Sequence, residues 1–111
     1  MAILHAINSS NWKDFFNSDL AIIMFSKSDC EQCKLLESAV KSLTLQGEPT
    51  FCKVMLDEGG LSDMKLEHKW ISNIDILPFN VLISKGVILE SWSGFDIEHL
   101  IESWKYRKNL E

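Results

Sequence analysis

Residues 20–25, LAIIMF, form the longest uninterrupted apolar run in the sequence, and a polar segment with a helix-like pattern follows them directly. A short continuous run of this kind is typical of a strand that is covered on both faces, as in a parallel or mixed sheet flanked by helices. We therefore expect residues 20–25 to form the central strand of an α/β fold. A membrane-spanning helix would need about 20 apolar residues in succession, so this run is too short to be one.

The segments around this run alternate between strand and helix patterns. Apolar residues spaced three and four positions apart predict a helix around Trp12 and another from Cys30 to a stop before Gly47. The same spacing predicts a last helix from Ile97 onward, and helix-favouring residue types predict one over residues 62–71. The other strands are expected at residues 2–7, 50–57, 79–84 and 87–93.

These elements follow one another in the order βαβαβαββα, which predicts an α/β fold with a central mixed sheet of about five strands and four flanking helices. Lys85 and Gly86 separate the last two strands and predict a tight hairpin. Asp96 is expected to cap the last helix. Because the sequence contains no repeat, low-complexity tract or linker, we expect one domain over residues 1–111.

The composition argues against several kinds of partner and location. The formal net charge is -5, and the basic residues are dispersed except for residues 105–108, so there is no stripe of positive charge for nucleic-acid phosphates. The first residues lack the basic and apolar segments of a secretory signal. Three cysteines are too few, and an odd number, for an extracellular disulfide framework. We expect a soluble cytoplasmic monomer with no nucleic-acid or membrane partner.

Cys30 and Cys33 lie three positions apart, where the predicted central strand gives way to a helix. Backbone N–H groups and the helix dipole stabilise a thiolate at such a helix start. Cys33 lies almost one turn further on the same face, so its sulfur can reach that of Cys30. We therefore expect Cys30 to attack a substrate disulfide and Cys33 to resolve the mixed disulfide that results.

A metal site and a pair of inert core cysteines are the other two interpretations of this spacing. A tetrahedral zinc site needs four ligands, but Cys52, His5, His68 and His99 show no paired spacing, so we expect no metal. Cys52 lies in a predicted buried strand and is expected to be a small core residue. The histidines are expected to be ordinary surface or partly buried residues.

The element order, the pair in SDCEQCK, the ILPF at residues 76–79 and the glycine in SGF at residues 93–95 together resemble the thioredoxin family over nearly the whole chain. The resemblance implies that Pro78 is a cis-proline that faces the cysteine pair, and that the main chain of Leu77 pairs with an extended substrate segment. It also implies an apolar surface around the disulfide.

By the same resemblance, Gly94 and Phe95 would border that apolar surface, although Phe95 could equally be a core aromatic residue. Trp92 could lie either in the core or at the rim of this surface. Lys53 matches a family lysine beneath the active site, and an ordinary strand lysine with a solvated ammonium is the alternative.

Between and beside the cysteines the sequence departs from the family pattern. Glu31 and Gln32 replace the usual glycine and proline, and Asp29 replaces the aromatic residue before the first cysteine. The negative charges of Asp29 and Glu31 disfavour a thiolate, so we expect Cys30 to ionise less readily than in standard members of the family.

The family's buried aspartate, six positions before the first cysteine, is replaced by Met24, which cannot accept a proton. The proton of Cys33 must therefore leave by another route. The candidates are Glu31 and a water molecule near Lys53.

The resemblance implies a thioredoxin-like enzyme that reduces protein disulfides without a cofactor, with disulfide-containing client proteins and either a thioredoxin-reductase-type or a glutathione electron donor. A glutaredoxin-like enzyme is one alternative, because SGFD at residues 93–96 is similar to a glutathione-binding segment, although minimal glutaredoxins lack the strand and helix expected in residues 2–17. A non-catalytic binding module is another alternative, because a fold does not fix a function and the Glu31-Gln32 insert is unusual.

Overall fold

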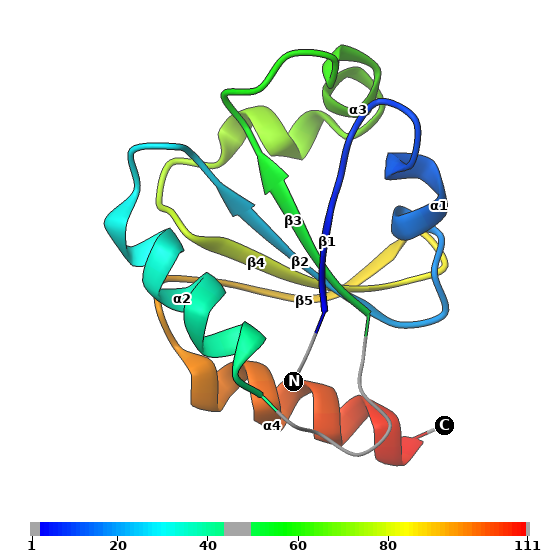
Figure 1. Ribbon diagram of the computed structural model, residues 1–111. Coiled ribbons are helices and arrows are strands. Elements are labelled where there is room, and N and C mark those ends of the chain that lie inside the picture. The colour runs from blue at the N-terminus through cyan, green and yellow to red at the C-terminus, as the bar shows by residue number, and fades with distance from the viewer. Residues whose placement is uncertain (1–2, 44–49, 111) are drawn as a thin grey trace.

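A five-stranded mixed sheet forms the middle of the molecule, and helices pack on both of its faces (Figure 1). The computed structural model describes residues 3–43 and 50–110. The strands are β1 (Leu4–Ala6), β2 (Ala21–Ser26), β3 (Thr50–Met55), β4 (Phe79–Ser84) and β5 (Val87–Ser93). The helices are α1 (Trp12–Phe16), α2 (Glu31–Lys41), α3 (Ser62–Glu67), α4 (Ile97–Leu110) and the short 3₁₀ helix η1 (Lys69–Asn73).

The predicted order of strands and helices and the mixed sheet are confirmed, with η1 as an addition. Residue 2, where the first strand was expected to begin, lies outside the described residues. Helix α2 ends at Lys41, before Gly47, as predicted. No described helix is both long enough and apolar enough to cross a membrane.

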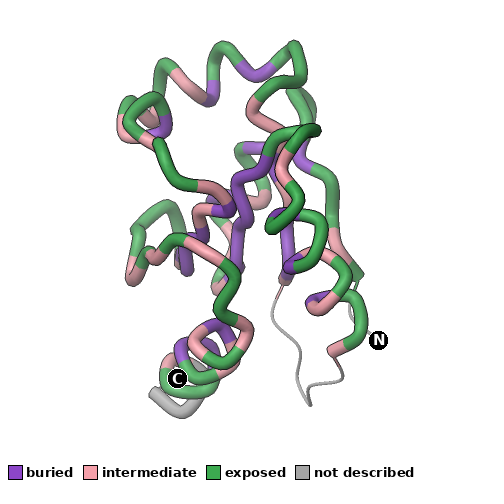
Figure 2. The backbone as a smooth tube through the Cα atoms, turned by 90° about the vertical axis from the view of Figure 1, so that its left-hand side faces the viewer, coloured by how far each residue is buried: buried purple, intermediate pink, exposed green. Residues whose placement is uncertain are grey.

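The strand order across the sheet is β1-β3-β2-β4-β5, so β2 is central as its apolar run predicts. The β1–β3 and β3–β2 pairs are parallel, and the β2–β4 and β4–β5 pairs are antiparallel. All residues of β2 are buried. Figure 2 shows that buried positions concentrate along the sheet, while the outer sides of the helices are exposed.

Each face of the sheet has its own apolar core. On one face, α1, α3 and η1 contribute the buried residues Trp12, Phe16, Met64 and Ile71. On the other face, α2 and α4 contribute the buried residues Leu36, Val40, Leu100 and Trp104. Full burial of one such side chain stabilises a fold by roughly 1.5 to 3 kcal/mol, so these contacts hold α2 firmly against the sheet.

The predicted hairpin and the predicted cap of the last helix are both present. Lys85 and Gly86 connect β4 to β5 with φ values of 50° and 82°, as a tight two-residue turn requires. The backbone N–H of His99 donates to Asp96 Oδ1 over 3.0 Å at the start of α4.

The predicted helix over residues 62–71 begins at Ser62 as expected, but it does not run unbroken to Ile71. Helix α3 ends at Glu67, His68 takes a non-helical conformation with φ -116° and ψ 78°, and η1 follows. The His68 ring packs against Phe16 and Trp12, with centroid distances of 4.8 and 5.9 Å. This aromatic packing overrides the helix preference of the local residues.

Candidate active site

Cys30 and Cys33 form a disulfide at the start of α2, with a Cα–Cα distance of 5.3 Å. Cys30 is the N-cap residue of this helix, and its Sγ accepts a hydrogen bond from the backbone N–H of Cys33 over 3.2 Å. One of the backbone donors left unpaired at the helix start therefore points at the first sulfur. The same donor and the helix dipole would stabilise a thiolate at Cys30 after reduction.

The two cysteines differ in exposure. Cys30 is partly exposed, whereas Cys33 is buried and only 3% exposed. An incoming disulfide can therefore reach the sulfur of Cys30 more easily than that of Cys33.

The loop before Cys30 is tied to the end of β3 by Ser28 and Asp57. Both the backbone N–H and the hydroxyl of Ser28 donate to Asp57 Oδ2, the former over 3.1 Å. These hydrogen bonds hold the pKa of the Asp57 carboxyl below its ordinary value. The pairing joins segments 29 residues apart, and no local pattern in the sequence pointed to it.

The residues between the cysteines lie on the surface. Glu31 and Gln32 are both exposed, and the Glu31 side chain is 86% exposed. Its carboxylate pairs with Lys34, one turn further along α2, over 3.6 Å. An exposed pair of this kind contributes little to stability, so Glu31 is held only loosely.

Beneath α2, a row of side chains crosses the sheet at one level. Met24 on β2 is in register with Lys53 on β3 and with Asn80 on β4, so all three side chains lie on the same face. Met24 is buried among the apolar residues of that face. Lys53 reaches up to α2, where its Nζ lies 3.1 Å from Glu37 Oε1.

Glu37 is a site residue that the sequence analysis missed. It lies four positions after Cys33 and therefore on the same face of α2, a spacing that could have pointed to it. Partial burial raises the pKa of Glu37, but hydrogen bonds from Lys53 and Lys41 and the attraction of their charges outweigh this effect. The pKa of Glu37 is therefore below its ordinary value, and the carboxylate is ionised at neutral pH.

Asn80 is a second residue that the sequence analysis missed, although a polar residue within the apolar pattern of residues 79–84 is a signal. Its side chain is fully buried, and its Nδ2 donates to the backbone oxygens of Trp92 and Gly94, each over 3.4 Å. Among the described residues, no partner accompanies Asn80 Oδ1 or the buried Trp92 Nε1. Asn80 thus links β4 to the start of the segment that follows β5.

The Leu77–Pro78 peptide bond is cis, as the resemblance implied. Pro78 is buried, Leu77 is partly buried, and the backbone N–H of Gly94 donates to the carbonyl oxygen of Pro78 over 2.8 Å. Phe95 is 44% exposed, so it is not a core aromatic residue. The strand register brings the 77–78 and 94–95 segments to the sheet edge from which the chain leaves β2 toward Cys30 (Figure 1).

Cys52 is fully buried on β3 and is not part of the disulfide. Burial raises the pKa of its thiol to about 12. Within residues 3–43 and 50–110, no three His, Cys, Asp or Glu side chains are grouped as a metal ion would require.

No family model matches the sequence, and no curated protein sequence matches it either. Solved thioredoxin structures, however, are similar to it in fold. Thioredoxin f2 from Chlamydomonas reinhardtii superposes with a TM-score of 0.76 at 16% identity, over 95% of this chain and 96% of that chain. Thioredoxin O2 from Arabidopsis thaliana, in its oxidised state, superposes with a TM-score of 0.74 at 18% identity, over 96% of this chain and 97% of that chain.

Thioredoxin NaTrxh from Nicotiana alata gives a TM-score of 0.73 at 23% identity, over 92% of this chain and 90% of that chain. Identities this low establish a shared architecture and leave the activity to be argued from the site itself. The chain therefore has the thioredoxin fold, with a Cys-X-X-Cys disulfide at the start of α2.

Proposed function

We propose that this protein is a thiol-disulfide oxidoreductase that reduces protein disulfides through Cys30 and Cys33. One observation carries the proposal: the partly exposed Cys30 caps α2 and is disulfide-bonded to the buried Cys33. A pair that is accessible at one sulfur and protected at the other suits a reaction in two steps with a short-lived intermediate.

In the first step, the Cys30 thiolate attacks one sulfur of the client disulfide. A mixed disulfide forms between Cys30 and that sulfur, and the second client sulfur leaves as a thiolate that takes a proton from water. The N–H of Cys33 and the dipole of α2 support the attacking charge. The neighbouring carboxylates of Asp29 and Glu31 weaken this support, which should moderate the reactivity of Cys30.

In the second step, the Cys33 thiolate attacks the Cys30 sulfur. The Cys30–Cys33 disulfide forms, and the first client sulfur leaves as a thiolate that takes a proton from water, so the pair has given two electrons to the client. A dithiol donor of thioredoxin-reductase type, or glutathione, must then reduce the pair again.

Cys33 must lose its proton before it attacks, and Met24 cannot accept it. We assign this role to water next to Lys53, because Glu37 holds the Lys53 ammonium beneath α2, one helical turn from Cys33. The positive charge of Lys53 would stabilise the forming thiolate. Glu31 is the weaker candidate, because its carboxylate is in solvent and paired with Lys34.

Client binding is assigned to the segments at the same sheet edge. The main chain of Leu77, next to Pro78, would pair with an extended stretch of the client, while Gly94 and the exposed Phe95 would border its apolar side chains. The clients are therefore disulfide-containing proteins whose cysteines lie in accessible, extended segments.

Reduction of insulin by dithiothreitol tests this function. The protein should accelerate the reaction, Cys30→Ser should abolish the acceleration, and Cys33→Ser should accumulate a mixed disulfide that mass spectrometry detects. Cys52→Ala is the matched control and should retain activity. An inactive parent protein would instead support a binding module, and effective replacement of dithiothreitol by glutathione would favour a glutaredoxin-like enzyme. Activity that survives Cys30→Ser would contradict the role of Cys30 as the attacking thiol.

A further inference from the structure

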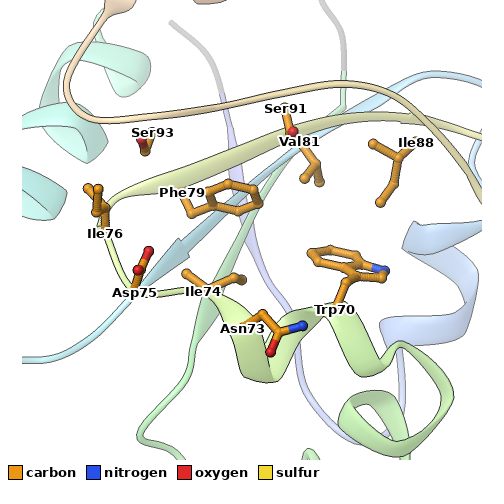
Figure 3. Close-up of a pocket in the computed structure, with 10 residues that line it drawn as sticks. All are labelled: Trp70, Asn73, Ile74, Asp75, Ile76, Phe79, Val81, Ile88, Ser91 and Ser93. Atoms are coloured by element: carbon orange, nitrogen blue, oxygen red, sulfur yellow. The ribbon is translucent and has the colours of Figure 1, made fainter.

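A cavity of about 280 Å³ lies between η1 and the β4–β5 hairpin, on the sheet face opposite α2. Figure 3 shows the Trp70 ring on one side and Val81 and Ile88 on the other, with their side chains directed toward one another. Phe79 lies beside them, and Ile76 lies at the end nearest the Leu77–Pro78 bond. The lining of this cavity is mainly apolar.

The cavity exists because β5 carries small side chains where it faces η1. Ser91 and Ser93 are in register with Val81 and Phe79 and therefore lie on the same face. A serine is too small to fill the space that a large β-branched or aromatic residue would occupy there. The hollow therefore stays open, and Ile88 and Ile76 at its margins are 39% and 58% exposed.

One end of the cavity is continuous with the segments assigned to client binding. Ile76 directly precedes Leu77, and Ser93 directly precedes Gly94, whose N–H donates to Pro78. A polypeptide that pairs with the main chain at Leu77 would therefore bring its neighbouring side chains to the mouth of this cavity.

The charges at this edge of the sheet are mostly negative. Asp75 lines the cavity, and the loops that end at the same edge, together with the first turn of α2, carry further exposed carboxylates. These are Asp29, Glu31, Asp57, Glu58 and Asp96. The exposed lysines in the same loops and the first turn of α2 are Lys27 and Lys34. A client segment with basic residues is therefore attracted, and an acidic one is repelled.

The size of the cavity indicates what it can hold. Pockets that bury a drug-sized ligand measure about 300 to 1,000 Å³, so this one is below that range. It is large enough for one big apolar side chain. We propose that the cavity binds a large apolar side chain of the client polypeptide, an inference that rests on the proposed function. The client residue next to this side chain is basic, so the cavity and the charges around it select cationic disulfide-containing segments.

Short synthetic peptides with a single cysteine test the proposal, each as a mixed disulfide with thionitrobenzoate. Cys30 displaces thionitrobenzoate or the peptide thiol, and absorbance and mass spectrometry follow both routes. In each peptide, Phe or Ala occupies one of the positions near the cysteine, and Lys or Glu occupies the position next to that Phe or Ala. We expect the best Phe-Lys peptide to react at least about tenfold faster than its Ala-Glu counterpart. The Lys preference should shrink as salt is added.

Two variants of the lining test whether the cavity causes the preference for Phe over Ala, and two charge variants test the preference for Lys over Glu. Ser91→Phe should fill the hollow and Ile88→Ala should remove one wall, so both should lower the Phe-over-Ala ratio toward one. Asp75→Lys should weaken the Lys preference. Asp19→Lys makes the same change of charge in the loop before β2, at the opposite end of that strand, and should leave the preference intact.

Reaction with the small disulfide dithiobis(nitrobenzoate), measured on the same proteins, separates the two proposals. If that disulfide reacts but Phe and Ala peptides are equivalent, or if neither cavity variant lowers their ratio, the cavity proposal is wrong and the proposed function stands. If neither the small disulfide nor any peptide reacts, both proposals are wrong together.

Discussion

Lys53 Nζ on β3 lies 3.1 Å from Glu37 Oε1 on α2, so an ion pair joins the sheet to the helix that carries the disulfide. Lys41, one turn after Glu37, contacts the same oxygen over 3.1 Å. The side chains of Lys53 and Glu37 are only 24% and 23% exposed, whereas that of Lys41 is 53% exposed. The inner of the two pairs is therefore the better shielded from water.

Glu37→Gln should lower the free energy of unfolding by about 1 kcal/mol at neutral pH, because it leaves Lys53 without its charged partner. The folded-state pKa of Glu37 is below its unfolded value, so this stability is present above the unfolded pKa and is lost as pH falls through the folded pKa. The difference from the parent protein should therefore shrink as pH falls below about 4. Urea unfolding across pH measures it.

Glu31→Gln is the control for this prediction, since it makes the same change on the same helix at a carboxylate that is 86% exposed. Its unfolding free energy should match that of the parent at every pH. A pH-independent cost for Glu37→Gln would show that the ionised carboxylate is not what stabilises the fold.

Lys53→Met should slow the resolution of the mixed disulfide by about tenfold, because the Cys33 thiolate would lose a nearby positive charge. Lys41→Met is the control: it also removes one of the two lysines that pair with Glu37, but it leaves Lys53 in place. It should have little effect on the rate of resolution. Stopped-flow measurement of peptide release from the preformed mixed disulfide gives this rate. A slow Glu31→Gln variant beside a normal Lys53→Met variant would reverse our assignment of the proton route.

The sequence predicts well those features that depend on neighbouring residues. The apolar run of β2, the spacing of Cys30 and Cys33, and the hairpin at Gly86 are local patterns, and the structure contains all three. The break at His68 was missed because it depends on rings from α1, far away in the sequence. A pattern of three or four neighbouring residues cannot reveal contacts between residues that are far apart in the sequence.

The features of the site that were missed have the same origin. The Lys53–Glu37 pair joins residues 16 positions apart, and only the position of Glu37 one turn after Cys33 hinted at it. The cavity requires that Ser91 face Trp70, which depends on the register of β5 and on the bend that places η1 over the sheet. The cysteine pair could be found from spacing alone, but its supporting residues could not.

Gly86→Ala should destabilise the fold by about 1 to 2 kcal/mol, because φ at this position is 82° and an L residue is strained there. A Cβ would also lie 3.1 Å from Asn17 Oδ1. Gly59→Ala is the matched control, since nothing lies within 4 Å of a Cβ at that position, and its effect should stay within about 0.5 kcal/mol. Thermal unfolding of both variants provides the comparison, and equal melting temperatures would contradict it.

Iodoacetamide should distinguish the three thiols of the reduced protein. Cys30 should react first, because it is partly exposed and caps α2, whereas Cys52 is fully buried with its thiol pKa raised to about 12. Cys52 should be labelled only when the chain unfolds, since the thiolate is the reactive form. Mass spectrometry after brief labelling, with and without urea, gives the order. Early labelling of Cys52 in the native protein would mean that β3 opens readily, and would contradict a rigid sheet beneath the disulfide.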